Sequence, residues 1–351
     1  MYVQIMFYYL LLYHDESNNI ITILQKQNIS FHLLKYEMGP PDPIVGLNEA
    51  FAEDTSPTKI NVGVGAYRSD DGLPLVLPCV REAEQIITNN PNLNHEYLGI
   101  VGDTQFVDLA LKFAYGDNSN VLSEKRVAAT QTLSGTGGLR VFGELIAQKG
   151  GHKHIYVPDP TWGNHIPIFR NAGLEVRKYR YYDAKNSTLQ FENTIKDIKE
   201  MPKGSVILLH ACAHNPTGMD PNPEQWAELS KAIKENHLLP FFDCAYQGFA
   251  SGNAPQDAFA IRMFVEDGHD LALVQSFSKN FGLYGQRVGA LSVIASNETE
   301  AKKVLSQMKM TIRPMYSNPP RYGAQIVKTI LSDDRLKNDF IDQCKVRAIT
   351  R

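Results

Sequence analysis

The apolar residues of the chain fall into two kinds of run that alternate along the sequence. Continuous apolar runs, SVILLH, LLPFFDC and LALVQSF, begin at residues 205, 238 and 271, and they predict buried strands of a parallel sheet. Around them, apolar residues recur with helical spacing, which predicts one helix at 105–114 and another after Asn222. Asn222 is the expected N-cap of the second helix, and Pro223 is its first residue. Strands that alternate with helices predict an α/β fold with a mostly parallel sheet.

Polar residues follow three of these strands at the point where each run ends. Asn215 lies in the turn after the first run, Asp243 ends the second, and Lys279 follows the third. The 36 residues from Asp243 to Lys279 leave room for about one strand, one helix and a parallel strand. These residues therefore fall at equivalent ends of successive strands, where open α/β sheets bind their ligands. Taken alone, Asp243 is equally explained as a structural cap of the next turn.

Lys279 lies in the stretch QSFSKNFGLYGQRVG, between Ser276 and Phe281 and eight residues before Arg287. Burial against apolar neighbours and a nearby guanidinium both lower a lysine pKa, which Schiff-base chemistry requires. The serine hydroxyls and the arginine suit a phosphate. A reactive lysine next to residues that can bind a phosphate suggests pyridoxal phosphate. Taken alone, this stretch also fits a solvated lysine in a loop.

A second phosphate candidate is the stretch TLSGTGGLRVFGELIAQ, in which a Ser/Thr/Gly-rich turn leads into an amphipathic helix. Ser134 and Thr136 would lie at the N-terminus of this helix, where backbone N–H groups favour anions. The stretch lacks the GK[ST] of a Walker loop and the GxGxxG of a dinucleotide fingerprint. It is a phosphate site only if other motifs support it.

Several further residues carry weaker signals. Trp162 follows a short strand and could stack on a planar ring or simply pack, and Gly63 and Gly65 allow a close approach of ligand or mark a bulge. Tyr97, in a turn-rich segment, reads alone as a half-buried tyrosine. The alternating His210, Cys212 and His214 lack a fourth ligand at standard spacing, so we interpret them as packing residues and expect no metal site.

Composition narrows the class of protein. The 351 residues suffice for a large core and probable division into two domains. A formal charge of -3 with 21% charged residues provides no basic field for nucleic acid or an anionic membrane, so a small-molecule substrate is favoured. The four cysteines show no CxxC spacing and predict reduced thiols in an intracellular compartment.

The N-terminal part of the chain has no recognisable targeting signal. The apolar run at residues 2–13 is too short to cross a bilayer, and the first arginine is Arg68. We therefore interpret residues 1–36 as an atypical extension. The proline-rich stretch from Met38 precedes a helix with Ile44, Leu47 and Phe51 on its apolar face, and it forms either an arm on a partner subunit or a plain linker.

Six motifs occur together and in order: SGTGGLR, PTWGNH, HACAHNPTG, FFDCAYQGFASG, FSKNFGLYGQRVG and RPMYSNPP. In them the chain resembles the aspartate aminotransferases, class I pyridoxal-phosphate-dependent enzymes, over about residues 37–347. EMGPPDPI and RPMYSNPP are most similar to the mitochondrial branch, which implies a mitochondrial matrix location, with the cytoplasm as the alternative. The implied reaction is L-aspartate plus 2-oxoglutarate to oxaloacetate plus L-glutamate.

The resemblance implies a type I pyridoxal-phosphate transferase fold. Its large domain, expected at 61–313, has a mostly parallel seven-stranded sheet flanked by helices. A small α/β domain would combine 37–60 with 314–351. The family also implies a homodimer with shared active sites.

The resemblance assigns catalytic roles to Lys279, Asp243, Tyr246 and Trp162. Lys279 would bind pyridoxal phosphate as a Schiff base and then move a proton, while Asp243 would pair with the pyridinium nitrogen. Tyr246 and Asn215 would bind the ring oxygen. Trp162 would stack on the ring, and His165 would lie behind Asp243. The cofactor-binding set is Ser134, Gly135, Thr136, Trp162, Asn215, Asp243, Tyr246, Ser276, Lys279, Arg287 and Tyr97.

The implied substrate-binding residues are Gly65, Trp162, Asn215 and Arg313. Arg313 would clamp the distal carboxylate through its planar guanidinium from across the dimer interface, and Tyr97 would reach the phosphate from the other subunit. Arg313 also argues against a purely aromatic specificity.

One departure from the family concerns the C-terminal part. The chain stops at Arg351, before the family's second substrate arginine, and a small domain so shortened would be incomplete. Loss of one partner of a buried charge pair costs about 3–5 kcal/mol. The alternative expectation is therefore a truncated, cofactor-binding chain with little or no transaminase activity.

Overall fold

The computed structural model describes residues 37–39, 45–61, 65–69 and 71–349. The chain has two compact units, Met1–Gly65 and Ala66–Arg351. The described part of the first unit contains the helix α3 (Val45–Glu53), and Lys59 Nζ donates to the carbonyl of Phe51 at 2.7 Å and lies 4.4 Å from the centre of its ring. Of the apolar face predicted for this helix, Leu47 is exposed, and Ile44, like Gly63, lies outside the described residues.

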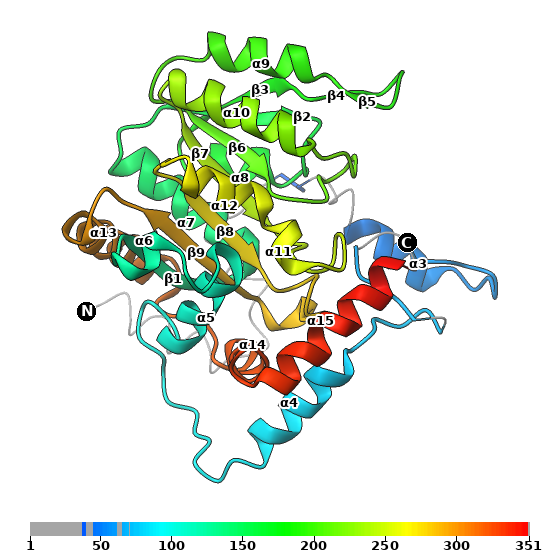
Figure 1. The fold of residues 1–351 in the computed structure, drawn as a ribbon. Coiled ribbons are helices and arrows are strands. Elements are labelled where there is room, and N and C mark those ends of the chain that lie inside the picture. The colour runs from blue at the N-terminus through cyan, green and yellow to red at the C-terminus, as the bar shows by residue number, and fades with distance from the viewer. Residues whose placement is uncertain (1–36, 40–44, 62–64, 70, 350–351) are drawn as a thin grey trace, which may run out of the picture. The chain divides into compact units, whose positions relative to one another are not determined.

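The second unit is built on a seven-stranded sheet in the order β1-β9-β8-β7-β6-β2-β3 (Figure 1). Its strands are β1 (Val127–Leu133), β2 (His154–Asp159), β3 (Glu175–Arg180), β6 (Val206–His210), β7 (Leu239–Cys244), β8 (Ala272–Ser276) and β9 (Val288–Ile294). Only β9 runs antiparallel to its neighbours in this sheet. The predicted mostly parallel, seven-stranded α/β sheet is confirmed.

Helices cover both faces of this sheet. The helices of this unit are α4 (Pro78–Thr88), α5 (Thr104–Tyr115), α6 (Asn120–Ser123), α7 (Ser134–Gln148), α8 (His165–Asn171), α9 (Phe191–Glu200), α10 (Pro223–Glu235), α11 (Ala254–Asp257), α12 (Phe259–Glu266), α13 (Glu298–Tyr316), α14 (Tyr322–Ser332) and α15 (Asp334–Ile349). A short hairpin, β4 (Tyr182–Asp183) with β5 (Thr188–Leu189), lies outside the main sheet. Among the described residues, no helix combines the length and apolar character needed to span a membrane.

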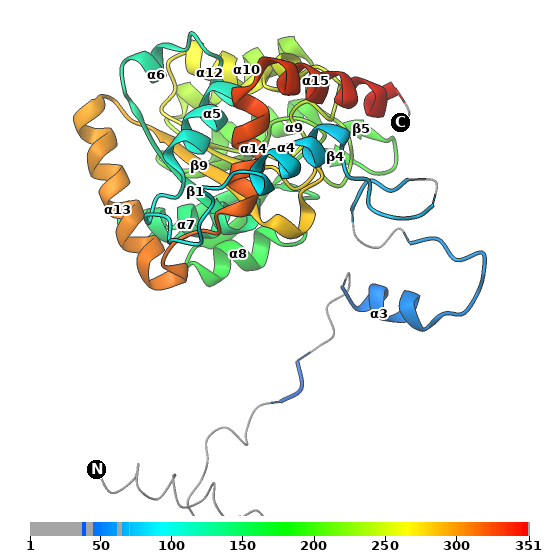
Figure 2. The same cartoon turned by 90° about the horizontal axis from the view of Figure 1, so that it is seen from below.

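Alternate residues of the central strands enter two separate apolar cores. Leu208, Phe241 and Val274 belong to the core beneath α7, α8 and α13, whereas Phe242 and Leu273 belong to the core beneath α5, α10 and α12. Figure 2 shows these two sets of helices on opposite sides of the sheet. Because successive side chains of a strand point to opposite faces, a strand buried on both faces must be apolar throughout. This explains the continuous apolar runs of the sequence.

The local boundaries follow the sequence signals closely in α5 and α10. α5 (Thr104–Tyr115) extends the predicted 105–114 helix by one residue at each end. α10 begins with a complete capping box, in which the Asn222 side chain accepts from the N–H of Gln225 and the Gln225 side chain accepts from the N–H of Asn222. The first apolar run and its strand β6 both end at His210, and in the turn that follows Asp220 accepts hydrogen bonds from the N–H groups of Ala213 and His214.

The predicted domain division, with a large domain at 61–313, stays a prediction. Its expected end, Arg313, lies inside α13 (Glu298–Tyr316).

Candidate active site at the carboxyl ends of the parallel strands

Three parallel strands in the middle of the sheet end side by side. In the register of β6, β7 and β8, Asp243 lies opposite His210 on one side and Val274 on the other. The loops that leave these strands carry Asn215, Tyr246 and Lys279. The structure thus brings together at one sheet edge the polar residues that the sequence predicted there, because parallel strands have their carboxyl ends at the same edge.

Lys279 is half-buried in the loop after β8. Burial lowers the pKa of its amine, the charge of Arg287 lowers it further, and Asp243 opposes both effects. The Nζ atom lies 5.5 Å from the centre of the Tyr284 ring. This environment favours the neutral amine, the form that attacks a carbonyl.

Buried contacts on both sides fix the loop that carries Lys279. Phe277 and Phe281 enter the core with their rings 5.4 Å apart. Asn280 is also buried, and its Nδ2 donates to the carbonyl of Gln247 at 3.0 Å, which joins this loop to the loop that carries Tyr246. The sequence reasoning did not single out Asn280, whose only signal is a polar residue in an otherwise aromatic stretch.

Three buried hydroxyl groups meet beside this loop. Ser134 Oγ lies 3.0 Å from Ser276 Oγ and 2.7 Å from Ser278 Oγ, and Arg287 Nη1 lies 3.4 Å from Ser278 Oγ. Ser134 is also the first residue of α7, followed by Gly135 and Thr136. Hydroxyls, a guanidinium and the N-terminus of a long helix together suit a phosphate group. Ser278, one of the serine hydroxyls that the sequence suggested for a phosphate, joins this cluster, although the cofactor-binding set implied by the resemblance did not include it.

Gly289 in β9 allows α7 to begin this close to the sheet. A Cβ atom at residue 289 would lie 2.6 Å from the carbonyl carbon of Ser134 and 2.6 Å from the carbonyl oxygen of Gln275. Any side chain there would therefore push Ser134 away from Ser276. The glycine is needed to assemble the hydroxyl cluster.

A chain of hydrogen bonds leads from Asp243 into the protein. His165 Nε2 lies 3.1 Å from Asp243 Oδ2, and its Nδ1 lies 2.8 Å from Thr161 Oγ1. Thr161 Oγ1 is also 3.4 Å from Nε2 of His210, whose Nδ1 accepts from the N–H of Asn215 at 3.2 Å. Because the last bond makes His210 Nδ1 an acceptor, a neutral His210 donates through Nε2, Thr161 donates to His165, and His165 donates to Asp243.

The direction of these hydrogen bonds makes Asp243 an acceptor. Burial and the neighbouring His214 and His165 hold the pKa of His210 well below its ordinary value, which agrees with a neutral ring. His165 is fully buried and connects the two. A donated hydrogen bond stabilises an ionised carboxylate, so Asp243 can hold a negative charge opposite a protonated ring nitrogen.

Two predicted aromatic residues, Trp162 and Tyr246, lie on loops at the same end of the sheet. The Trp162 ring lies 5.2 Å from the His165 ring and perpendicular to it. Tyr246 is half-buried in a turn in which its carbonyl accepts from the N–H groups of Phe249 and Ala250. Trp162, Tyr246 and Asn215 thus come from three different loops around Asp243, at the edge where the sequence expected them.

His210 and His214 stack rather than converge as ligands. Their ring centres are 4.3 Å apart, and His214 also stacks on Tyr181 at 4.1 Å and lies 2.8 Å from Thr217 Oγ1 through its Nδ1. Burial lowers the pKa of His214 to about 4. No group of three or more possible metal ligands occurs in the part of the chain that the structure describes.

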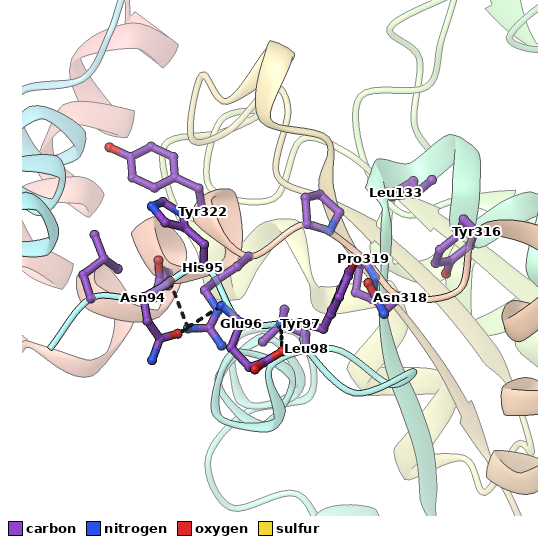
Figure 3. Close-up of a pocket in the computed structure, with 14 residues that line it drawn as sticks. Asn94, His95, Glu96, Tyr97, Leu98, Leu133, Tyr316, Asn318, Pro319 and Tyr322 are labelled. Carbon is purple, nitrogen blue, oxygen red and sulfur yellow. Dashed lines mark hydrogen bonds between the residues drawn. The ribbon is translucent and has the colours of Figure 1, made fainter.

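Three predicted residues are exposed in the single chain. Tyr97 is 81% exposed, and Arg313 is exposed on α13, where its Nη1 donates to Ser317 Oγ. Gly65 is exposed and belongs to the first unit. Tyr97 lines a cavity of about 720 Å³ that Leu133, the residue before Ser134, also lines (Figure 3).

The donor groups at the sheet edge match one kind of cofactor. Lys279 offers an amine of lowered pKa for an aldehyde, Asp243 offers a carboxylate oxygen for a ring nitrogen, and the hydroxyl cluster with Arg287 offers donors for a phosphate. Pyridoxal phosphate carries all three groups. The fold and the site therefore define a pyridoxal-phosphate-dependent enzyme of the α/β class.

Comparison with known proteins identifies the family. Residues 57–351 match the aminotransferase class I and II family. The chain is 52% identical over 306 residues to the cytoplasmic aspartate aminotransferase of Oryza sativa subsp. japonica, covering 87% of this chain and 75% of that protein. It is 52% identical over 309 residues to the mitochondrial aspartate aminotransferase of Dictyostelium discoideum, covering 88% and 72%.

A solved structure agrees with this match. An aromatic amino acid aminotransferase of Burkholderia pseudomallei, covalently bound to pyridoxal phosphate, aligns with a TM-score of 0.86 and 40% identity over 90% of this chain and 79% of that one. The chain belongs to the class I and II aminotransferases, enzymes that depend on pyridoxal phosphate. Its similar proteins include both mitochondrial and cytoplasmic members.

Proposed function

We propose that the protein is an aspartate transaminase that converts L-aspartate and 2-oxoglutarate to oxaloacetate and L-glutamate. The observation that carries this proposal is Lys279, a half-buried amine whose pKa is lowered beside Asp243 and the serine cluster. The 52% identity of the chain to two aspartate aminotransferases supports the choice of substrate.

Pyridoxal phosphate would be held by groups from four loops and the N-terminus of α7. The phosphate would lie against Ser134, Gly135, Thr136, Ser276 and Arg287, with Tyr97 supplied by the second subunit. When bound, the cofactor supplies an electron sink for the pair left on Cα after it loses its proton. Asn215 and Tyr246 would donate to the ring oxygen, and Trp162 would stack on the ring.

Lys279 would serve as both the anchor and the proton carrier. An amine whose pKa is lowered more readily takes the neutral form, which can accept the proton from Cα of the amino acid and return it to a neighbouring carbon. Burial, the first cause of the lowered pKa, supplies this property, because the charged form is disfavoured away from water.

Asp243 would keep the ring nitrogen protonated, and the hydrogen-bond chain behind it would hold it in place. His165 fixes one carboxylate oxygen at 3.1 Å, and Thr161 fixes the orientation of His165 at 2.8 Å. A carboxylate held in this way does not have to reorganise when charge develops in the ring.

The substrate would be bound by Trp162, Asn215, Gly65 and Arg313. The planar guanidinium of Arg313 suits a bidentate pair with the distal carboxylate of aspartate or glutamate. The exposure of Arg313 and Tyr97 in the single chain supports a homodimer in which both residues serve the active site of the neighbouring subunit.

The activity assay is direct. The purified chain, loaded with pyridoxal phosphate, is expected to form glutamate from aspartate and 2-oxoglutarate, and Lys279→Ala is expected to lose at least about a thousandfold in rate, because it lacks both the anchor and the base. A chain that binds the cofactor with a change of absorbance but does not turn over aspartate would contradict the proposal and support the cofactor-binding alternative.

A second candidate is an aromatic amino acid aminotransferase, because a solved structure that aligns over 90% of the chain has that activity. The same assay with phenylalanine in place of aspartate separates the two. We expect aspartate to give the higher kcat/KM, and we expect Arg313→Leu to lower kcat/KM for aspartate more than for phenylalanine.

We also propose a mitochondrial location, on the likeness of EMGPPDPI and RPMYSNPP to the mitochondrial branch. Imaging of the full-length chain with a C-terminal fluorescent tag tests this, and a diffuse cytoplasmic signal would contradict it.

A further inference from the structure

Two segments that are far apart in the sequence form the walls of the cavity beside Tyr97. Residues 93–98 form one wall, and Tyr316, residues 318–322 and Gln325 form the other (Figure 3). The first segment carries Tyr97, and the second follows α13, which carries Arg313. These are the two residues that the proposed function assigns to the neighbouring subunit.

Polar bonds join the two segments and also the residues that follow each of them in the sequence. Arg321 Nη1 donates to Asn94 Oδ1 at 2.8 Å. Lys328 in α14 donates to Asp103 Oδ2 at 2.6 Å, in a contact that is mostly buried. The positions of Tyr97 and of the turn after α13 are therefore coupled.

The side chain of Gln131 connects the stretch that follows Tyr97 in the sequence, at Asp103, to Pro320 in the second segment. It is fully buried in β1. Its Oε1 accepts from the N–H of Asp103 at 3.0 Å, and its Nε2 donates to the carbonyl of Pro320 at 2.7 Å. Its own N–H donates to the carbonyl of Val101 at 2.9 Å. An amide can donate and accept at once, and a side chain with only one of these functions would leave one of these partly buried backbone groups without its partner.

The backbone near Gln131 is also shaped to fit this side chain. Gly102 has a φ of +84°, and a Cβ there would lie 2.3 Å from Gln131 Cβ and 2.5 Å from its Oε1. The segment after Tyr97 thus passes directly over the amide. The contact has no room for a bulkier residue.

We propose that Gln131 is a positioning residue for the active site of the neighbouring subunit, acting by holding the Tyr97 segment and the turn after α13 in one fixed arrangement. This inference rests on the proposed function, in which Tyr97 and Arg313 act across the dimer interface. β1, which carries Gln131, also leads into Ser134 of the same chain. The competing outcome is therefore that Gln131 affects the active site of its own subunit.

Mixed dimers separate the two outcomes. Two differently tagged copies are co-expressed, and dimers that carry both tags are purified. The reference pair is an unsubstituted copy with a Lys279→Ala copy, which leaves one working lysine. In the first test pair, Gln131→Met is placed in the copy that has the lysine. In the second, it is placed in the Lys279→Ala copy, which supplies Tyr97 and Arg313 to the working site.

The first test pair is expected to match the reference. The second is expected to lose about tenfold or more in kcat/KM for aspartate, because small misplacements of binding groups carry large costs in rate. It is also expected to lose pyridoxal phosphate faster on dialysis against phosphate buffer, since Tyr97 would contact the cofactor phosphate. Loss in the first pair alone, equal loss in both, or loss in neither would overturn the proposal.

Two controls isolate the inference from folding and from the proposed function. Gln275→Met removes another buried side-chain amide, whose Nε2 donates to the carbonyl of Ala110 at 3.0 Å. When this substitution is placed in the Lys279→Ala copy, the activity of the mixed dimer is expected to stay unchanged. Tyr97→Phe in the same pairs tests subunit sharing by itself. A reference pair without transaminase activity would refute the proposed function, while the dialysis rates would still decide the role of Gln131. Should Gln131→Met give no soluble dimer, Gln131→Asn, which is too short to make both bonds, replaces it in every pair.

Discussion

Lys279 carries an amine on which burial and two neighbouring charges act in different directions. Burial and Arg287 lower its pKa, and Asp243 raises it. The sequence stretch around it predicted partial burial and the influence of Arg287. It did not predict Asn280, whose amide joins the loop to the carbonyl of Gln247, because that contact depends on how two loops meet.

Replacing this amine by an apolar side chain, in Lys279→Met, is expected to raise the free energy of unfolding of the cofactor-free protein at neutral pH. A lowered pKa in the folded state means that the unfolded chain binds the proton first as pH falls from the ordinary lysine value, so protonation favours unfolding. The gain is therefore expected to be full below the folded-state pKa of Lys279 and to vanish as pH rises towards the ordinary value.

Urea unfolding at a series of pH values measures this gain. Lys231→Met is the control, because the Lys231 side chain is 75% exposed and its removal should give no such trend. A gain that grows with pH would contradict the interpretation of Lys279.

Individual elements were predicted best where the signals are local. The N-cap of α10 was predicted from Asn222 and Pro223, and the structure adds Gln225, which completes a capping box. The turn after β6 was less predictable, because it depends on Asp220 accepting from the backbone N–H groups of Ala213 and His214. The hydrophobic pattern contains no trace of this contact.

Removing the cap of α10 is expected to destabilise the protein modestly. Asn222→Ala leaves the N–H of Gln225 without its side-chain acceptor, which should cost about 1 kcal/mol in the free energy of unfolding. Chemical denaturation monitored by circular dichroism measures it. Asn222→Ser restores an acceptor and should recover most of the loss, and equal losses in the two variants would show that capping is not the cause.

Across the second unit as a whole, C-terminal helices share a core with the loop of Lys279. Phe340 in α15 stacks on Phe281 with their ring centres 4.0 Å apart and lies 6.2 Å from the ring of Phe113 in α5. The chain therefore ties α15 to the active-site loop through side chains alone. The sequence shows an apolar residue at position 340, but its partners Phe281 and Phe113 are determined by how α15, α5 and the loop of Lys279 pack together.

Phe340→Ala is expected to lower the free energy of unfolding by about 3–5 kcal/mol, because it removes a fully buried ring and leaves a cavity. Thermal and urea unfolding measure this loss. The matched control is Asn338→Ala, at an exposed position of the same helix, which should change stability by less than about 0.5 kcal/mol. A loss of similar size in the control would mean that the helix, not the ring, is responsible.

The sequence by itself determined the alternation of strands and helices and the placement of Asn215, Asp243 and Lys279 after successive strands. These features depend on the spacing of apolar residues and on the direction of parallel strands, which are properties of short stretches. Only the tertiary structure decided that β1, β9 and β8 lie side by side. That order brings Ser134 within 3.0 Å of Ser276, across 142 positions, and places Gln131 within reach of Pro320. Contacts of this kind are fixed by the packing of whole elements, and no local pattern encodes them.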